Sequence, residues 1–161
     1  LLVAPYTPGE ILLGKGIASV ITGIMQAVFV VLVAMFWFRI PFQGSVWLLS
    51  AALLLFIVTA AAIGLCISSF AQSLQQAIVG TFLLLVPMVM LSGFATPISS
   101  MPEIFQDLTL LNPMRYGLEL IQRIFLEGAG FLDLWPLFAA IMTVTVVAVL
   151  AAIFSFHHKI S

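Results

Sequence analysis

Charge is the scarcest property of this sequence: Asp, Glu, Lys and Arg make up 7% of its 161 residues, against 63% hydrophobic residues. All charged residues, five basic and six acidic, lie outside four apolar windows, which run over 16–38, 46–69, 77–95 and 134–156. A water-soluble bundle would carry charges on the outer faces of such stretches. A helix rising about 1.5 Å per residue covers roughly 28–36 Å with each window, enough to cross a hydrocarbon core of about 30 Å. We therefore expect membrane lipid around these helices.

Cysteine and histidine are almost absent, which excludes several kinds of chemistry. The single cysteine, Cys66, cannot form an internal disulfide, and we expect it to pack as a small apolar residue. The two histidines, His157 and His158, stand together beside Lys159, so no Ser/His/Asp or Cys/His set is available. A metal-binding tail is less favoured than a solvated end at the membrane edge, because a third ligand is lacking. The net charge of −1 leaves no basic face for nucleic acid.

The first window does not have the form of a removable signal peptide, because it is too long and starts after fifteen residues of organised sequence. The chain starts with Leu1, so we expect a piece of a longer protein. Four spans would place both ends on one side of the membrane. The positive-inside rule does not choose that side: one side receives two cations and the other receives three, namely Lys15 and Lys159 against Arg39, Arg115 and Arg123.

Two regions outside the windows predict short helices. Ahead of the first window, Thr7, Pro8 and Glu10 form a capping box for a helix over 7–15. It would either lie at the membrane interface or dock a partner. Within the first window itself, small residues recur on one face, which lets another helix approach closely: Gly16, Ser19, Gly23 and Ala27. In the third window Pro87 predicts a kink, because proline removes one backbone hydrogen bond.

The segment 97–133 is rich in helix signals. Ser100 and Glu103 form a capping box for a helix over about 100–111, and Asn112 with Pro113 starts another over 113–127. The second helix has an apolar face and a charged face. These faces consist of Met114, Leu118, Ile121 and Phe125, and of Arg115, Glu119, Arg123 and Glu127. We expect the two helices to form a re-entrant or interfacial pair.

Three further patterns each have a plain alternative. Residues 9–15 match G-x-x-x-x-G-K of a phosphate-binding loop, but Gly16 stands where Ser or Thr should follow and no strand precedes, so we reject nucleotide binding. Gln26 either lines a pathway or hydrogen-bonds a neighbouring helix, and the second is favoured. Glu103 and Asp107 lie one turn apart, where a solvated face is favoured over a cation site.

Taken in order, several motifs resemble the C-terminal half of type-2 ABC exporter permeases. The motifs are Pro5-x-x-Pro-Gly-Glu10, Gln75-Gln76, Leu91-Ser-Gly-Phe94, Pro97, Met101-Pro102, Asn112-Pro113 and Tyr116. The resemblance covers nearly the whole chain. It implies an all-α polytopic membrane bundle of four transmembrane helices, a short cytoplasmic coupling helix and the two re-entrant helices.

The resemblance also implies roles for particular residues. The helix over 7–15 would dock into a separate ATPase subunit, with Tyr6, Pro8, Glu10 and Leu12 as contacts. Both ends would be cytoplasmic, in a bacterial inner membrane, and the helices over about 100–111 and 113–127 would form an external gate. The gate residues would be Asn112, Pro113, Arg115, Tyr116, Glu119 and Arg123.

The expected function is that of a permease subunit without catalytic residues, cofactor or metal, which works with an ATPase and a second permease copy or paralogue. Its small-molecule cargo is expected to be drug-like, amphipathic or lipid-linked. One alternative is a membrane scaffold that recruits a soluble partner through the same first helix. A lipid-modifying membrane enzyme ranks last, because the sequence lacks a set of acid, base or metal ligands at the membrane edge.

Overall fold

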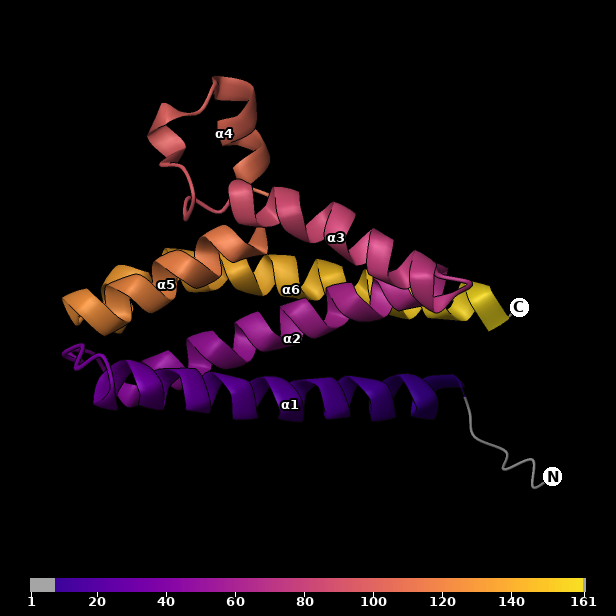
Figure 1. The fold of residues 1–161 in the computed structure, drawn as a ribbon, viewed down its shortest axis with the longest axis horizontal. Helices are drawn as coiled ribbons and strands as arrows, with labels where there is room; N and C mark the ends of the chain where they lie inside the picture. The colour runs from indigo at the N-terminus through magenta and orange to yellow at the C-terminus, as the bar shows by residue number, and fades with distance from the viewer. Residues whose placement is uncertain (1–7, 161) are drawn as a thin grey trace.

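The computed structural model describes the backbone of residues 8–160 and the side chains of 9–11 and 13–155. The elements of this part of the chain are all helical. In order they are α1 (Pro8–Phe36), α2 (Val46–Phe70), α3 (Leu74–Met90), the short 3-10 helix η1 (Ile98–Ser100), α4 (Glu103–Thr109), α5 (Pro113–Glu127) and α6 (Phe131–Ile160). Helices α1, α2, α3, α5 and α6 lie along one another, and α4 lies outside this bundle, beyond the end of α3 (Figure 1).

Three of the predicted windows become helices long and apolar enough to cross a membrane. The stretches that qualify are Gly9–Phe36, Val46–Phe70 and Phe131–Ser155. The separate helix expected over 7–15 is not seen, because α1 continues without a break from Pro8 through Gly14, Lys15 and Gly16. No proline or capping residue interrupts the chain there, so each added residue extends the existing helix at little cost.

The remaining predicted span, the third window over 77–95, is not confirmed. Helix α3 has 17 residues and ends at Met90, five residues before the predicted end. Its length of about 25 Å is less than a typical hydrocarbon core. Pro87 lies in its last turn, not near the middle of a longer helix, and Gly93 follows with φ +88°. The N–H groups of Leu91 and Ser92 donate to the Pro87 and Val89 carbonyls at the end of the helix, and Gly93 then turns the chain away in the left-handed region that glycine adopts without strain.

The direction of each helix decides which loops and helix ends lie on the same side. The start of α1 and the end of α6 lie at one end of the bundle, and the loops 37–45 and 128–130 lie at the other (Figure 1). We call these the terminal end and the loop end. Helix α2 occupies the centre and packs against α1, α3, α5 and α6. The small-residue face of α1 serves this packing, because Gly16 and Gly23 lie against Leu65 and Ile57 of α2.

The outer surface of the bundle is apolar. No described side chain of α1 is buried within the chain, although nearly all of them are apolar. All three tryptophans of the sequence lie towards the loop end and are exposed: Trp37 by 82%, Trp47 by 86% and Trp135 by 58%. Tryptophan is enriched where membrane hydrocarbon meets water. The loop end therefore has the features of a membrane interface.

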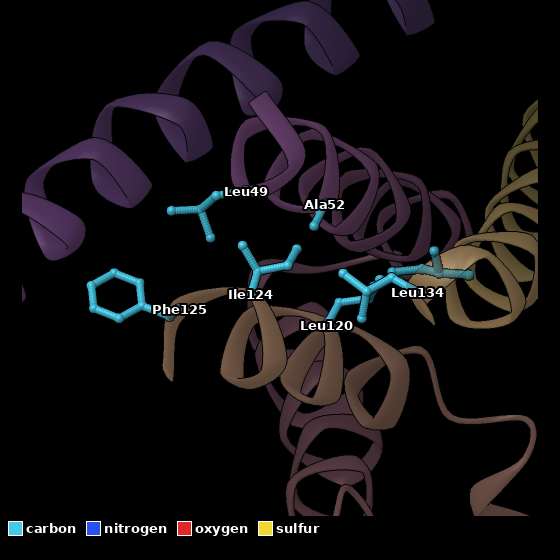
Figure 2. Packing of buried hydrophobic residues seen from close by; sticks show 7 residues of the cluster. Leu49, Ala52, Leu120, Ile124, Phe125 and Leu134 are labelled. Atoms are coloured by element: carbon cyan, nitrogen blue, oxygen red, sulfur yellow. The ribbon is translucent and has the colours of Figure 1, made fainter. Parts of the chain in front are cut away.

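The buried core is small and lies towards the loop end, where three helices meet. Leu49 and Ala52 of α2 face Leu120 and Ile124 of α5, and Leu134 of α6 closes the cluster (Figure 2). Leu120, Ile124 and Leu134 have no exposed surface. The core therefore fastens the short helix α5 to two membrane-spanning helices.

Further along the bundle, α2 and α6 are joined by polar side chains. The hydroxyls of Thr59 and Thr145 lie 2.6 Å apart and are buried, and the Cys66 thiol lies 3.6 Å from the Ser155 hydroxyl. Both pairs advance in the same direction along the two helices, so α2 and α6 run parallel. Each threonine hydroxyl also lies within 2.7 Å of its own i−4 carbonyl. The two hydroxyls have two protons between them for these three contacts. One hydroxyl therefore donates to its own i−4 carbonyl, and the other donates to the first hydroxyl across the interface.

This contact predicts a measurable coupling between two substitutions. Replacing Thr59 and Thr145 by valine, singly and together, keeps the side-chain shape and removes the hydroxyls. Hydrogen bonds between membrane helices contribute about 0.6 kcal/mol on average. We expect a double-mutant cycle on unfolding in detergent to give a coupling free energy of about 0.5–1.5 kcal/mol. Strictly additive effects would show that the two hydroxyls do not interact.

The start of α4 differs from the prediction. The chain over 98–100 forms η1, and the residue that precedes α4 is Pro102, which supplies no side-chain cap. The Ser100 hydroxyl instead donates to the Pro97 carbonyl at 2.7 Å. The expected capping box of Ser100 with Glu103 is therefore wrong. Pro97 and Pro102 bracket the short helix and hold the backbone extended before α4, which keeps Ser100 away from the N–H groups it would cap.

Candidate functional site

The candidate site is helix α5 with the chain that leads into and out of it. Its ends follow the predicted signals. The Asn112 side chain accepts from the Met114 N–H at 3.0 Å, Pro113 takes the first helical position, and Gly128 ends the helix with φ +64°. These caps depend on local sequence alone, which is why the predicted range 113–127 is confirmed residue for residue.

Asn112 also joins α5 to α3. Its amide nitrogen donates to the carbonyl of Met88 at 2.7 Å, and the residue is 5% exposed. Carbonyls in the last turn of a helix lack partners within that helix. One side chain therefore satisfies an orphan acceptor of α3 and an orphan donor of α5.

Two glycines allow the loop 37–45 to lie directly on the last turn of α5. A Cβ atom on Gly44 would lie 2.1 Å from the Ile124 carbonyl oxygen, and one on Gly128 would lie 2.8 Å from the Gln43 carbonyl oxygen. The Gln43 N–H donates to the Phe125 carbonyl at 3.2 Å, and the rings of Phe42 and Phe125 meet edge to face at 5.1 Å. Both contacts require the loop backbone to approach α5 more closely than a side chain at position 44 or 128 would permit.

The buried face of α5 differs from the predicted one. The prediction chose Met114, Leu118, Ile121 and Phe125, but only Phe125 of these is buried. The buried residues of the helix are Pro113, Gly117, Leu120, Ile124 and Phe125. A Cβ on Gly117 would lie 2.5 Å from the Phe56 ring of α2, so the absence of a side chain sets the closest approach. Hydrophobic periodicity cannot detect a face that is selected by a glycine.

The three half-buried residues of the predicted face line a cavity instead. Met114, Leu118 and Ile121 border a space of about 300 Å³ together with Phe56 of α2 and Val89 of α3. A second groove, of about 370 Å³, lies between α3 and the turn before α5. It is lined mainly by leucines and ends at polar Asn112: Leu83, Leu84, Pro87, Met88, Leu91, Leu108, Leu111 and Asn112.

The charged face of α5 forms only part of the expected ladder. Arg123 lies 3.8 Å from Glu119 and 3.4 Å from Glu127. Arg115 does not extend this series: its guanidinium donates to the Thr109 hydroxyl and lies 6.0 Å from the centre of the Tyr116 ring. The Tyr116 hydroxyl donates to the Leu110 carbonyl at 2.7 Å. Arg115 and Tyr116 therefore tie the start of α5 to the end of α4.

The polar residues of α1 border a larger groove. Gln26, with Ser19 and Thr22, lines a space of about 770 Å³ between α1, α2 and α5. The Ser19 and Thr22 hydroxyls donate to carbonyls of their own helix, at 2.9 Å and 2.8 Å. Both readings of Gln26 stay open, because the groove is large enough for another helix or for a small molecule.

Of the residues expected to contact a partner, those that the structure describes lie at the terminal end. Tyr6 is outside the described residues, and so are the side chains of Pro8 and Leu12, whose backbone forms the first turns of α1. Glu10 is exposed. The sequence 9–15 is helical throughout, so its N–H groups are not arranged as a loop that could hold phosphate. Among the described residues, no three His, Cys, Asp or Glu side chains lie close enough to hold a metal ion.

Comparison with known proteins gives a consistent result. A family model described as ABC-2 type transporter matches residues 1–126. The probable multidrug ABC transporter permease YbhR of Escherichia coli (strain K12) is 31% identical over 160 residues, which are 99% of this chain and 44% of YbhR. The inner membrane transport permease YhhJ of the same strain is 35% identical over 147 residues, which are 89% of this chain and 39% of YhhJ.

A third relative from that strain, the probable multidrug ABC transporter permease YbhS, is 33% identical over 132 residues, or 80% of this chain and 34% of YbhS. No solved structure matches the chain. The chain spans less than half the length of these relatives. The family model covers most of the chain, including α1, α2, α3 and nearly all of α5. The chain belongs to the ABC-2 type transporter family.

Proposed function

We propose that this chain provides membrane helices of the permease subunit of an ATP-driven exporter, and that a separate ATPase subunit hydrolyses the ATP. The observation that carries the proposal is the family match over residues 1–126, with relatives named as permeases. The apolar, exposed surfaces of the long helices agree with a place in lipid. A scaffold that only recruits a partner has no such support from the relatives.

The first turns of α1 are the proposed ATPase contact, through Pro8, Glu10 and Leu12, together with Tyr6, which precedes the helix in sequence. This stretch is the start of α1, which lies at the terminal end of the bundle (Figure 1). A Cβ atom on Gly9 or Gly14 would meet no other atom within 4 Å. Because α1 is continuous, a displacement of its first turns by the ATPase would be transmitted to the whole helix. In this sense we propose that α1 acts as a lever.

We further propose that the terminal end is cytoplasmic and that the loop end faces outward, in a bacterial inner membrane. In this orientation α3 is the third of four crossings. It is short because the chain leaves it inside the membrane to form α4 and α5. These two helices would act as an external gate, with Asn112, Pro113 and Tyr116 at its hinge and Glu119 with Arg123 on its outer face.

Two permeases, identical or paralogous, and two ATPases would form the exporter. We propose that its cargo is drug-like, amphipathic or lipid-linked.

Leu12→Asp tests the lever. A carboxylate placed in an apolar docking contact costs several kcal/mol unless it is paired. We expect the variant to insert in the membrane and to retain ATPase activity, while ATP-dependent export falls at least about tenfold. Export would be measured in inverted membrane vesicles, and Leu12→Ile, which keeps size and apolarity, serves as control. Normal export by Leu12→Asp would show that this segment is not the coupling contact.

The exporter and scaffold hypotheses are separated by one reconstitution. The full permease and its co-purifying ATPase are placed in vesicles, and uptake of candidate compounds is followed with ATP and with a non-hydrolysable analogue. Uptake that requires both ATP and the ATPase supports the exporter. Stable binding of a soluble partner without any ATP-dependent movement of solute supports the scaffold.

A further inference from the structure

The first turn of α5 lies deep inside the membrane-spanning part of the bundle. Gly117 packs against Phe56, which is ten residues into α2 and so about 15 Å from the start of that helix. Along α5 itself, Arg115 lies nine residues before Ile124, which contacts Gly44 in the loop at the loop end. Nine residues of helix correspond to about 14 Å. Both estimates put Arg115 near the middle of a hydrocarbon core of about 30 Å.

At this depth Arg115 has no carboxylate partner within the described part of the chain. Glu119, the residue one turn away, is paired with Arg123 instead. The contacts of Arg115 are the Thr109 hydroxyl and the Tyr116 ring. A guanidinium has five N–H donors and stays charged at any physiological pH. Most of its hydrogen-bonding capacity is therefore open to a group from outside the chain.

Neither helix stability nor solvation by the bundle explains this cation. Positive side chains stabilise the C-terminal end of a helix, whereas Arg115 lies in the first turn of α5, next to the positive end of the helix dipole. A charged residue at mid-membrane depth is costly, and such residues typically face an interior cavity and serve a function. Arg115 is half-buried, so part of its surface faces outward from this chain.

We propose that Arg115 binds the anionic group, a carboxylate or phosphate, of an amphipathic ligand. A guanidinium matches both groups with two parallel hydrogen bonds. The groove of about 370 Å³ between α3 and the turn before α5 would take the apolar part. Asn112, which is one of its lining residues, lies three residues before Arg115. This inference rests on the proposed function and narrows the cargo to amphipathic anions. An anionic lipid headgroup has the same chemistry, and the test separates the two sources.

Direct binding tests the site without relying on transport. The full permease is placed in phosphatidylcholine nanodiscs and titrated with a fluorescent fatty acid, its uncharged methyl ester and the amine of equal chain length. We expect the acid to bind wild-type protein more tightly than the ester or the amine. Arg115→Gln should weaken binding of the acid by about tenfold or more, the size of a charge-assisted contact, and leave the ester unchanged. Arg115→Lys should keep part of the preference.

Arg39→Gln is the matched control, because it removes one positive charge from the loop 37–45, outside the proposed site, and should leave binding of the acid unchanged. Equal affinity of wild type and Arg115→Gln for the acid would overturn the proposal, as would equal affinity of wild type for acid and ester. Loss of a permease dimer in Arg115→Gln without any change in acid affinity would also overturn it, in favour of a carboxylate from a second copy.

Adding phosphatidylglycerol to the nanodiscs identifies the source of the anion. If a lipid headgroup occupies Arg115, this lipid should reduce acid binding to wild type and not to Arg115→Gln. If cargo is the ligand, acid binding should persist, and ATP-dependent uptake in vesicles should favour the acid in an Arg115-dependent way. Charge-independent uptake would contradict the assignment of the anion to the cargo and leave the exporter intact. Absence of any uptake, with anion binding preserved, would contradict the exporter alone.

Discussion

Gly44→Ala is expected to detach the loop 37–45 from α5 and to cause the largest loss of stability of any single methyl group in the described structure. The new Cβ would lie 2.1 Å from the Ile124 carbonyl oxygen and 2.8 Å from its Cγ2 atom. The obstacle is a backbone atom in the last turn of α5, which cannot turn away as a side chain can. Relief of the clash requires loss of the Gln43 to Phe125 hydrogen bond and of the Phe42 to Phe125 ring contact.

The expected cost is about 3 kcal/mol or more, at the upper end of what overpacking usually costs. It would be measured as a lower unfolding midpoint of the protein in detergent, together with faster proteolysis in the loop. Gly64→Ala in α2 is the matched control, since a Cβ there would meet no atom within 4 Å and alanine favours a helix. Equal midpoints for Gly44→Ala and Gly64→Ala would show that the loop does not lie on α5 in this way.

Asn112→Ala is expected to have the second-largest effect, because one buried side chain serves two helices. The variant loses the cap of α5, at about 1 kcal/mol. It also leaves the Met88 carbonyl of α3 without its partner, at about 1–3 kcal/mol. Water cannot replace the lost bonds easily at a site that is 5% exposed. The sum is a loss of about 2–4 kcal/mol in the free energy of unfolding.

Asn112→Ser separates the two contributions. The serine oxygen can still accept from the Met114 N–H, but it is too short to reach the Met88 carbonyl. Unfolding in detergent should place Asn112→Ser between wild type and Asn112→Ala. Spin labels on α3 and α5 should report a broader distance distribution in both variants. A stability of Asn112→Ser equal to that of Asn112→Ala would mean that only the link to α3 matters, and equality with wild type would mean that only the cap does.

Several features followed from the sequence because they depend on properties of neighbouring residues. The windows 16–38, 46–69 and 134–156 correspond to α1, α2 and α6, although α1 ends at Phe36, since the absence of charge over about twenty residues is independent of the rest of the fold. The range of α5 was also predictable, because Asn-Pro at one end and glycine at the other are local signals. The small-residue face of α1 was recognised as a helix contact, although its partner α2 could not be identified.

Other features could not be predicted from the local sequence. The end of α3 at Met90 and the fusion of residues 8–15 with α1 both run against plausible readings of the local sequence. The charged face of α5 suggested an unbroken ladder, but Thr109 and Tyr116 hold Arg115 away from it. A pairing rule based on spacing along one helix does not include partners from another segment.

By itself, the sequence determined that this protein is a helical membrane protein and where its long helices and the caps of α5 lie, because hydrophobicity and capping act over a few residues. Only the tertiary structure decided which face of α5 is buried and that Asn112 joins two helices. It also decided that the Arg115 guanidinium, deep in the bundle, has no carboxylate partner among the described residues. These outcomes depend on close contacts between segments far apart in the chain. Glycines at 44, 117 and 128 permit those contacts, and a missing side chain leaves no periodic pattern from which to predict them.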